Sequence, residues 1–316
     1  MFEVQISAVQ GAADGIVDIE LVPVAGGPLP QFEAGSHIDV EVAPGLVRQY
    51  SLHNSPHETH RYCIAVLRSP QSRGGSEAVH RDFHAGKVIS VSAPRNNFRL
   101  EDAPAETLLI AGGIGITPLL SMAEYQASCG KRFALHYFAR SRSRAAFVDR
   151  ISDSADLGAS SHFHFGDDAQ KVQDCLADIL DRRAPGAHVY ICGPTGFIES
   201  TREAALRAGM TAAEVHVEHF GAEVSTAGKQ FTVVARRSGV EVTVGESQTI
   251  AQCLAAKGLP VALSCEQGVC GTCLTAVLEG TPDHRDLYQS DDEKAKNDMI
   301  TICCSRSRSP RLVLDI

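Results

Sequence analysis

The sequence lacks a long apolar run, a basic tract and a leader-like start, and each absence excludes a class of protein. No stretch approaches the roughly eighteen apolar residues that a membrane-spanning helix needs, so no segment is expected to cross a membrane. Lysine and arginine number 29 against 38 acidic residues, for a net charge of -9, which argues against a nucleic-acid partner. The start, MFEVQISAVQ, lacks the basic and apolar regions of a signal peptide, so we expect a cytoplasmic protein.

The length and the cysteine content set further limits. A chain of 316 residues is long enough for two or three domains, each with its own core. In the reducing cytoplasm, the ten cysteines are expected to be metal ligands or core residues more often than disulfide partners.

Three segments follow one another along the chain, each with its own hydrophobic pattern. Six short, mostly alternating runs predict an antiparallel β-barrel over residues 1–102. Apolar strands then alternate with helical patterns, which predicts a doubly wound parallel sheet over 103–222. A small, polar linker is predicted at 223–230, and a third domain that begins with a strand–turn–strand pattern is predicted at 231–316.

The third segment contains a cysteine motif, C-x4-C-x2-C, whose fourth cysteine follows after 29 further residues. This is the plant-type spacing for a [2Fe–2S] cluster. A compact loop folds three thiolates around the cluster, and a separate strand supplies the last one. The predicted ligands are Cys265, Cys270, Cys273 and Cys303.

A structural zinc site is the main alternative for these cysteines. Zinc sites favour two C-x2-C pairs, and the adjacent Cys303 and Cys304 make a poor second pair. Gly268 and Gly271 instead suit a loop whose backbone N–H groups approach the cluster sulfurs closely. We therefore favour the cluster and expect Cys304 to be a core neighbour.

A glycine-rich turn, AGGIGITP, follows an apolar strand and precedes a predicted helix. We expect Thr117 to cap that helix and Pro118 to occupy its first position. Glycines at such a turn let a pyrophosphate approach the helix N-terminus, although the G-x-G-x-x-G fingerprint is incomplete here. The predicted nucleotide-binding residues are Gly112, Gly113 and Gly115, with Cys192, Gly193 and Pro194 at the end of a later strand.

Two motifs in the first segment suit a phosphorylated ring. RQYSL places Arg48 and Tyr50 on one face of a strand, where an arginine can bind phosphate and a tyrosine can stack on a ring. Gly74, Gly75 and Ser76 precede a predicted helix and form a second candidate phosphate site. For each motif alone, a solvated strand face or a plain helix cap is an equal alternative.

The order of all these motifs resembles that of the phthalate dioxygenase reductase family, over essentially the whole chain. The resemblance implies an FMN-binding barrel, a nicotinamide domain and a C-terminal plant-type ferredoxin domain of the β-grasp fold. It implies that FMN is bound by Arg48, Tyr50, Ser51, Leu52, Ala65, Val66, Leu67, Gly74, Gly75, Ser76, Thr117 and Phe220.

The resemblance also implies a function. Electrons from NADH would pass through FMN and the cluster to a Rieske-type terminal oxygenase that acts on an aromatic acid, with this chain a monomer. A flavin can accept two electrons and release them singly, which suits a one-electron cluster. Two alternatives stay open: a stand-alone flavin oxidoreductase that reduces a small molecule, and an electron carrier with an inactive reductase half.

Two signals oppose each other on the choice of nicotinamide. Arg140, Arg142 and Arg144 follow a predicted strand, where they can meet the 2′-phosphate of NADPH. Loop arginines are also commonly solvated, and the family that the chain resembles mostly uses NADH. We predict a preference for NADH, with Arg142 or Arg144 leaving some activity with NADPH.

The stretch TPDHRDLYQSDDEKAKND, between the third and fourth predicted ligands, mixes six acids with three bases. A docking surface and a solvated loop are both consistent with this composition.

Overall fold

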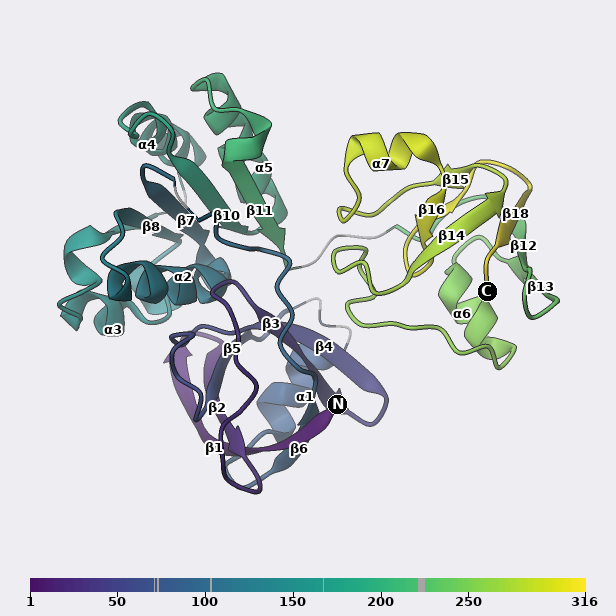
Figure 1. Ribbon diagram of the computed structural model, residues 1–316, viewed down its shortest axis with the longest axis horizontal. Helices are drawn as coiled ribbons and strands as arrows, with labels where there is room; N and C mark the ends of the chain where they lie inside the picture. Colours follow the sequence, from purple (N-terminus) through teal and green to yellow (C-terminus); the bar gives the residue numbers. More distant parts are fainter. Residues whose placement is uncertain (71, 73, 103, 167, 221–224) are drawn as a thin grey trace. The chain divides into compact units, whose positions relative to one another are not determined.

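The computed structural model describes residues 1–70, 72, 74–102, 104–166, 168–220 and 225–316. The chain forms two compact units, Met1–Phe220 and Gly221–Ile316 (Figure 1). The first two residues of the predicted linker, 223 and 224, lie outside the described residues, as do 103, 167, 221 and 222 of the predicted second domain. No helix in the described ranges is long and apolar enough to cross a membrane.

The first half of unit 1 is an antiparallel barrel. Its elements are β1 (Phe2–Ala13), β2 (Ile16–Pro23), β3 (His37–Ala43), β4 (Leu46–Ser51), β5 (Tyr62–Leu67), α1 (Gly75–Asp82) and β6 (Val88–Val91). The strand order is β4-β3-β6-β1-β2-β5, and a bridge between Leu52 and Ile64 joins the two end strands. That bridge closes the sheet around an apolar interior, so the predicted barrel is confirmed.

The second half of unit 1 is a parallel sheet with helices on both faces. Its elements are β7 (Thr107–Gly112), η1 (Gly113–Gly115), α2 (Ile116–Ser128), β8 (Phe133–Ala139), η2 (Arg142–Arg144), α3 (Val148–Asp153), η3 (Gly158–Ser160), β9 (Ser161–Phe165), α4 (Ala169–Asp181), β10 (His188–Gly193), α5 (Thr195–Arg207), η4 (Ala212–Glu214) and β11 (Val215–His219).

The order of this sheet is β11-β10-β7-β8-β9, with every neighbouring pair parallel. Helices α2 and α3 bury their apolar faces in one core, and α4 and α5 in another. The predicted doubly wound fold is therefore confirmed. Because the strand order reverses between β7 and β10, the carboxyl ends of these two strands form the crevice where such sheets bind ligands.

A buried histidine ties the two halves of unit 1 together. Arg150 Nη1 lies 3.1 Å from His53 Nδ1, and His53 Nε2 lies 2.8 Å from Asp18 Oδ1. Since a guanidinium only donates, His53 carries its proton on Nε2 and donates it to Asp18. The imidazole also packs on the ring of Phe147, with ring centroids 4.5 Å apart. His53 thus has a structural role.

Unit 2 is a β-grasp domain. Its elements are β12 (Phe231–Ala235), β13 (Val240–Val244), α6 (Ile250–Ala256), β14 (Leu274–Glu279), β15 (Pro282–Asp283), α7 (Asp291–Lys296), β16 (Met299–Thr301), β17 (Arg306–Ser307) and β18 (Arg311–Leu314). The order of the main sheet is β13-β12-β18-β14-β16, and β12 and β18 are parallel. Helix α6 begins with a capping box between Thr249 and Gln252 and packs its apolar side into the core.

Two arginines hold the first described residues of unit 2. Arg306 is only 2% exposed, and its guanidinium donates to the carbonyls of Thr226, Gly228, Lys229, Gly245 and Gln248. Arg285 donates to the carbonyls of Ser225 and Ala227 and pairs with Asp283 at 2.7 Å. Most of the predicted linker is therefore bound to unit 2 by its own backbone carbonyls.

Candidate functional site

Arg48 of β4 lies against the turn that begins α1. A Cβ atom placed on Gly75 would lie 2.7 Å from Arg48 Cγ and 2.9 Å from Arg48 Nε, so the glycine provides the space for this side chain. Gly74 precedes the helix with a φ of 84°, a left-handed conformation that favours glycine. Ser76 accepts a hydrogen bond from the Ser69 N–H at 3.1 Å. The structure thus brings the predicted arginine and the predicted phosphate turn together.

The other residues predicted to line the flavin differ in exposure. Tyr50 is half-buried against the barrel core, and burial raises the pKa of its phenol. Leu52 and Val66 lie inside the barrel core, so only their backbone groups can face a cofactor. Ala65 is buried, whereas Leu67 is 40% exposed. Tyr50 and Leu67 are therefore the side chains of this group that can contact a flavin ring.

A serine and a carboxylic acid join β4 to β11. The Ser51 hydroxyl donates to Glu218 Oε2 at 3.4 Å. Burial raises the pKa of Glu218 to about 8, and the bond from Ser51 only partly offsets this effect. Cys192 of β10 pairs directly with Glu218, and burial also raises the pKa of its thiol. The raised pKa favours the protonated form of the Glu218 carboxyl.

Glu218 is missing from the residues predicted from the sequence. The available signal was an acid within the apolar stretch that precedes the predicted Phe220. Phe220 itself follows β11, and its side chain is 38% exposed.

Glycines allow the carboxyl ends of β7 and β10 to pack closely together, at the point where the strand order of the sheet reverses. A Cβ atom on Gly115 would lie 2.2 Å from the Cys192 carbonyl oxygen, and one on Gly193 would lie 3.0 Å from Gly112 Cα. The ring of Phe197 packs against Gly112 and Gly193. These glycines are required by close packing of the strand ends, whereas a Cβ atom on Gly113 would meet nothing within 4 Å. Gly113 therefore faces the open part of the crevice.

The predicted start of the following helix is wrong. Helix α2 begins at Ile116, its cap is Gly115, and no side chain caps it. Thr117 lies inside the first turn, only 2% exposed, and its hydroxyl donates to the Ile114 carbonyl at 3.1 Å. The 3-10 turn η1 runs directly into α2 and sets the backbone of the helix start without a capping side chain.

The arginine loop after β8 is held by acids. Arg142 Nη2 lies 2.6 Å from Asp149 Oδ1. Ser143 donates through its hydroxyl to Asp14 Oδ2 at 2.6 Å, and its carbonyl accepts from the Asp14 N–H at 2.8 Å. Arg144 is exposed. Of the three arginines predicted to be able to meet a 2′-phosphate, Arg142 is already paired with a carboxylate.

The predicted cluster ligands converge in unit 2. Cys265, Cys273 and Cys303 are each 5% exposed, and Cys270 is half-buried. The thiol of Cys265 contacts those of Cys270 and Cys303, which lower its pKa, and Cys273 also contacts Cys303.

The loop that carries three of these cysteines points backbone N–H groups at sulfur. The Gln267 N–H lies 3.3 Å from Cys265 Sγ, and the Thr272 N–H lies 3.5 Å from Cys270 Sγ. Gly268 and Gly271, each with a φ of 71°, supply the left-handed turns of the loop. Such N–H donors stabilise thiolate and cluster sulfur, so the loop suits an anionic iron–sulfur group.

The contacts join all four thiols in one group, since Cys265 contacts both Cys270 and Cys303, and Cys303 also contacts Cys273. In the described part of the chain, no group of three or more histidines, cysteines or acids is placed to hold a single metal ion. The C-x4-C-x2-C spacing with a distant fourth cysteine, and the N–H groups directed at sulfur, favour a [2Fe–2S] cluster over a zinc ion. Cys304 is 1% exposed and fills the space beside Gly268, where a Cβ atom would lie 2.6 Å from its Sγ.

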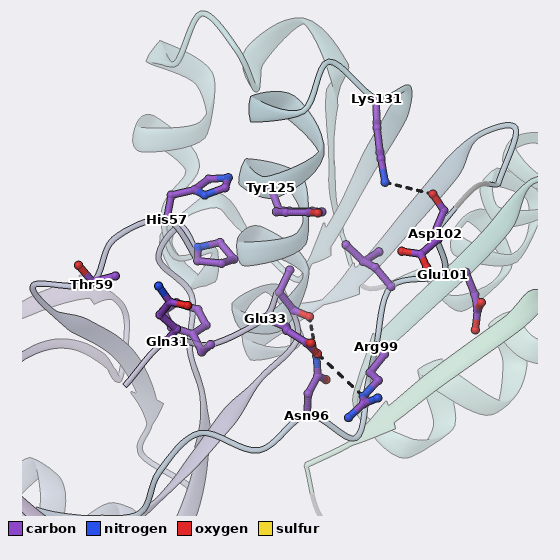
Figure 2. Close-up of a pocket in the computed structure, with 14 residues that line it drawn as sticks. Gln31, Glu33, His57, Thr59, Asn96, Arg99, Glu101, Asp102, Tyr125 and Lys131 are labelled. Atoms are coloured by element: carbon purple, nitrogen blue, oxygen red, sulfur yellow. Dashed lines mark hydrogen bonds and ion pairs between the residues drawn. The ribbon is translucent and has the colours of Figure 1, made fainter. Parts of the chain in front are cut away.

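A separate hollow in unit 1, of about 500 Å³, contains none of the predicted residues (Figure 2). Several polar groups that line it bind one another or the backbone: Arg99 lies 3.9 Å from Glu33, and Lys131 donates to the Asp102 carbonyl at 3.1 Å. We assign it no part in the cofactor site.

Comparison with known proteins adds to this geometry. Residues 233–308 match the family described as the 2Fe-2S iron-sulfur cluster binding domain. The chain is 47% identical over 320 residues to a vanillate O-demethylase oxidoreductase of Pseudomonas sp. (strain HR199 / DSM 7063), covering 100% of both. It is 41% identical to a tetrachlorobenzoquinone reductase of Sphingobium chlorophenolicum, covering 99% of this chain and 98% of that protein.

Among solved structures, the chain is similar to phthalate dioxygenase reductase, described as a modular structure for electron transfer from pyridine nucleotides to [2Fe-2S]. The TM-score is 0.81 at 37% identity, and the match covers 100% of this chain and 98% of that one.

Proposed function

Because this chain belongs to the phthalate dioxygenase reductase family, we propose that it is the NADH-dependent reductase component of an oxygenase system. The observation that carries the proposal is a group of four converging thiols on the same chain as a flavin-type barrel and a nucleotide-type sheet. The acceptor is a Rieske-type terminal oxygenase that acts on an aromatic acid, and the reductase works as a cytoplasmic monomer.

The barrel binds FMN. Arg48 and the N-terminus of α1 hold its phosphate, because a guanidinium and free helix N–H groups both favour an anion. Tyr50 and Leu67 would contact the ring, together with the backbone of β4 and β5. When bound, the flavin accepts two electrons at once and releases them singly, and the cluster carries single electrons. The full set of proposed flavin residues is the one predicted from the sequence.

The crevice between β7 and β10 binds NADH. Gly113 provides the open approach to the start of α2, and Cys192, Gly193 and Pro194 form the opposite side. The ion pair between Arg142 and Asp149 leaves that arginine less available to a 2′-phosphate, which supports NADH over NADPH.

Cys265, Cys270, Cys273 and Cys303 hold the [2Fe–2S] cluster in unit 2, and Cys304 packs beneath their loop. The proposed domains are the barrel at 1–102, the nicotinamide domain at 103–222 and the ferredoxin domain at 231–316.

A second function has a specific observation in its favour. One relative at 41% identity is a tetrachlorobenzoquinone reductase, so reduction of a small quinone is the alternative activity for this chain.

The deciding experiment starts with the purified protein. Its absorbance spectrum, with extraction and identification of the flavin, tests for FMN and a [2Fe–2S] cluster together. Steady-state kcat/KM is then compared for an oxygenase component or cytochrome c and for free flavins or quinones. Faster reduction of the protein acceptors supports an oxygenase reductase. Faster reduction of the quinones supports the alternative.

A further inference from the structure

Two exposed apolar side chains lie directly on the cluster loop of unit 2. Leu287 is 43% exposed and Tyr288 is 44% exposed; we call them the Leu287–Tyr288 patch. The Leu287 N–H donates to the Gly268 carbonyl at 2.9 Å. A Cβ atom on Gly271 would lie 2.3 to 2.6 Å from three ring carbons of Tyr288, so the ring rests on the backbone of Gly271. Gly271 lies between two of the proposed ligands, Cys270 and Cys273.

The turn beneath the patch is fixed by buried polar contacts. Asp286 is 2% exposed, and its Oδ2 accepts from the Gln289 N–H at 2.8 Å. Its carbonyl accepts from Lys294 Nζ at 2.8 Å. The backbone of the patch is therefore ordered before any partner arrives, while its apolar side chains face outward. A preorganised apolar surface loses little entropy on binding, which favours a docking role over a merely solvated loop.

The segment that carries the patch, residues 281–298, has six acidic residues against three basic ones, so its net charge is negative. Arg285 forms an ion pair with Asp283, whereas Lys294 keeps its charge and donates to the Asp286 carbonyl. Asp291 and Asp292 in the first turn of α7 are exposed, and they make no ion pair or side-chain hydrogen bond within the described residues. A complementary partner therefore presents an apolar spot flanked by lysine or arginine.

We propose that the Leu287–Tyr288 patch is the surface through which the cluster passes electrons to the terminal oxygenase. The inference rests on the proposed function and names the docking surface for it. The transfer moves one electron from the reduced cluster to the oxidised metal centre of the acceptor; no bond forms or breaks and no proton moves. Tyr288 covers Gly271 of the cluster loop, so an acceptor seated on its ring lies over the loop that carries three of the proposed ligands. The acidic turn steers the basic partner toward it.

The flavin half of the same chain is the competing occupant, since the cluster must also receive electrons. The experiment separates the two with a double variant, Leu287→Ser with Tyr288→Ser. The matched control is Leu278→Ser: Leu278 is 48% exposed and lies roughly 17 Å along β14 from Cys273, by the usual rise of a β-strand. The probe acceptor is oxidised cytochrome c, a small basic haem protein.

Two quantities are measured in the full-length holoprotein. The first is the Kd and KM for cytochrome c at low ionic strength. The second is the single-turnover rate at which NADH bleaches the cluster absorbance. We expect the double variant to raise the Kd and KM on the order of tenfold, as for loss of an interface hot spot, and to leave the bleaching rate unchanged. The control should leave both unchanged.

Charge gives an independent readout. Asp291→Asn with Asp292→Asn should flatten the dependence of the cytochrome c association rate on ionic strength. If the double apolar variant loses its cluster, this charge variant tests the proposal alone. In that case, an association rate with cytochrome c that depends on ionic strength as in the wild type overturns the proposal.

Slower cluster bleaching in the double variant, with or without a change in Kd, shows that the flavin half uses the patch and overturns the proposal. No change in either quantity overturns it as well. A wild-type protein whose cluster NADH does not reduce refutes the proposed function itself, which is a different result.

Discussion

Replacement of Gly75 by alanine tests the flavin site through a single methyl group. The new Cβ atom would lie 2.7 Å from Arg48 Cγ and 2.9 Å from Arg48 Nε, closer than real Cβ atoms come to other heavy atoms. Gly75 does not adopt a left-handed φ, so its backbone accepts alanine and the barrel still folds. Arg48 is flexible and is the group that must move.

The expected loss of FMN affinity follows from the proposed bond between Arg48 and the FMN phosphate. A charge-assisted hydrogen bond to phosphate is worth about 1.5 to 3 kcal/mol, which corresponds to a loss of roughly 10-fold to 150-fold in FMN affinity if the arginine is removed by Arg48→Ala. Gly75→Ala only displaces it, so we expect about tenfold weaker binding of FMN. Alanine is the better helix former, so the apoprotein should be equally or slightly more stable, by up to about 1 kcal/mol.

The assay is fluorescence titration of FMN into the apoprotein, with the unfolding midpoint measured alongside. Gly196→Ala is the matched control, because a Cβ atom there meets nothing within 4 Å. In an Arg48→Ala background, Gly75→Ala should have no further effect on FMN affinity. The cluster absorbance should not change in any of these variants. Unchanged FMN affinity in Gly75→Ala, or an equal loss with and without Arg48, would refute the reasoning.

Three further predictions concern the cluster, Glu218 and the nicotinamide. Serine at each of the four proposed cysteine ligands should abolish cluster absorbance, and serine at Cys304 should spare it; the reverse result for Cys303 and Cys304 would exchange their roles. The pKa of Glu218, about 8, lies above its ordinary value of 4.5, so the apoprotein should lose stability as pH rises from about 5 to 8. Glu218→Gln should flatten that profile of unfolding midpoint against pH, and an unchanged slope would contradict the raised pKa. The wild type should prefer NADH by kcat/KM. Asp149→Ala should release Arg142 and raise the NADPH to NADH ratio, and alanine at Arg142 and Arg144 should abolish the residual NADPH activity. A wild-type preference for NADPH that this double substitution erases would contradict the assignment.

Patterns that are local in sequence predicted the fold well. Alternating runs indicated the barrel, the change to alternating strands and helices indicated the parallel sheet, and all are confirmed. The family inferred from the order of the motifs is confirmed as well. The cysteine spacing predicted one loop with a distant fourth ligand, and the four thiols do converge. Such features follow from residue patterns, spacings and order along the chain, which a sequence displays directly.

Contacts between residues that are far apart in the chain could not be predicted from the sequence. Ser51 and Glu218 are 167 residues apart, and no periodicity links them. Threonine is a residue type that often caps helices, which is why Thr117 was predicted as the cap. In the structure the 3-10 turn η1 runs directly into α2, so the helix begins one residue before Thr117. The packing of Tyr288 on Gly271 depends on how a loop of unit 2 folds back, which composition does not reveal.

The arginines that bind the first residues of unit 2 bear on how such proteins exchange modules by recombination. Arg306 contacts five backbone carbonyls, and three of them belong to Thr226, Gly228 and Lys229. A crossover at Phe231 would leave this guanidinium, 2% exposed, with only the carbonyls of Gly245 and Gln248 from that set. A buried cation deprived of acceptors destabilises its host. A cluster domain that is moved to another protein should therefore begin no later than Ser225, so that it includes the backbone carbonyls that Arg285 and Arg306 bind.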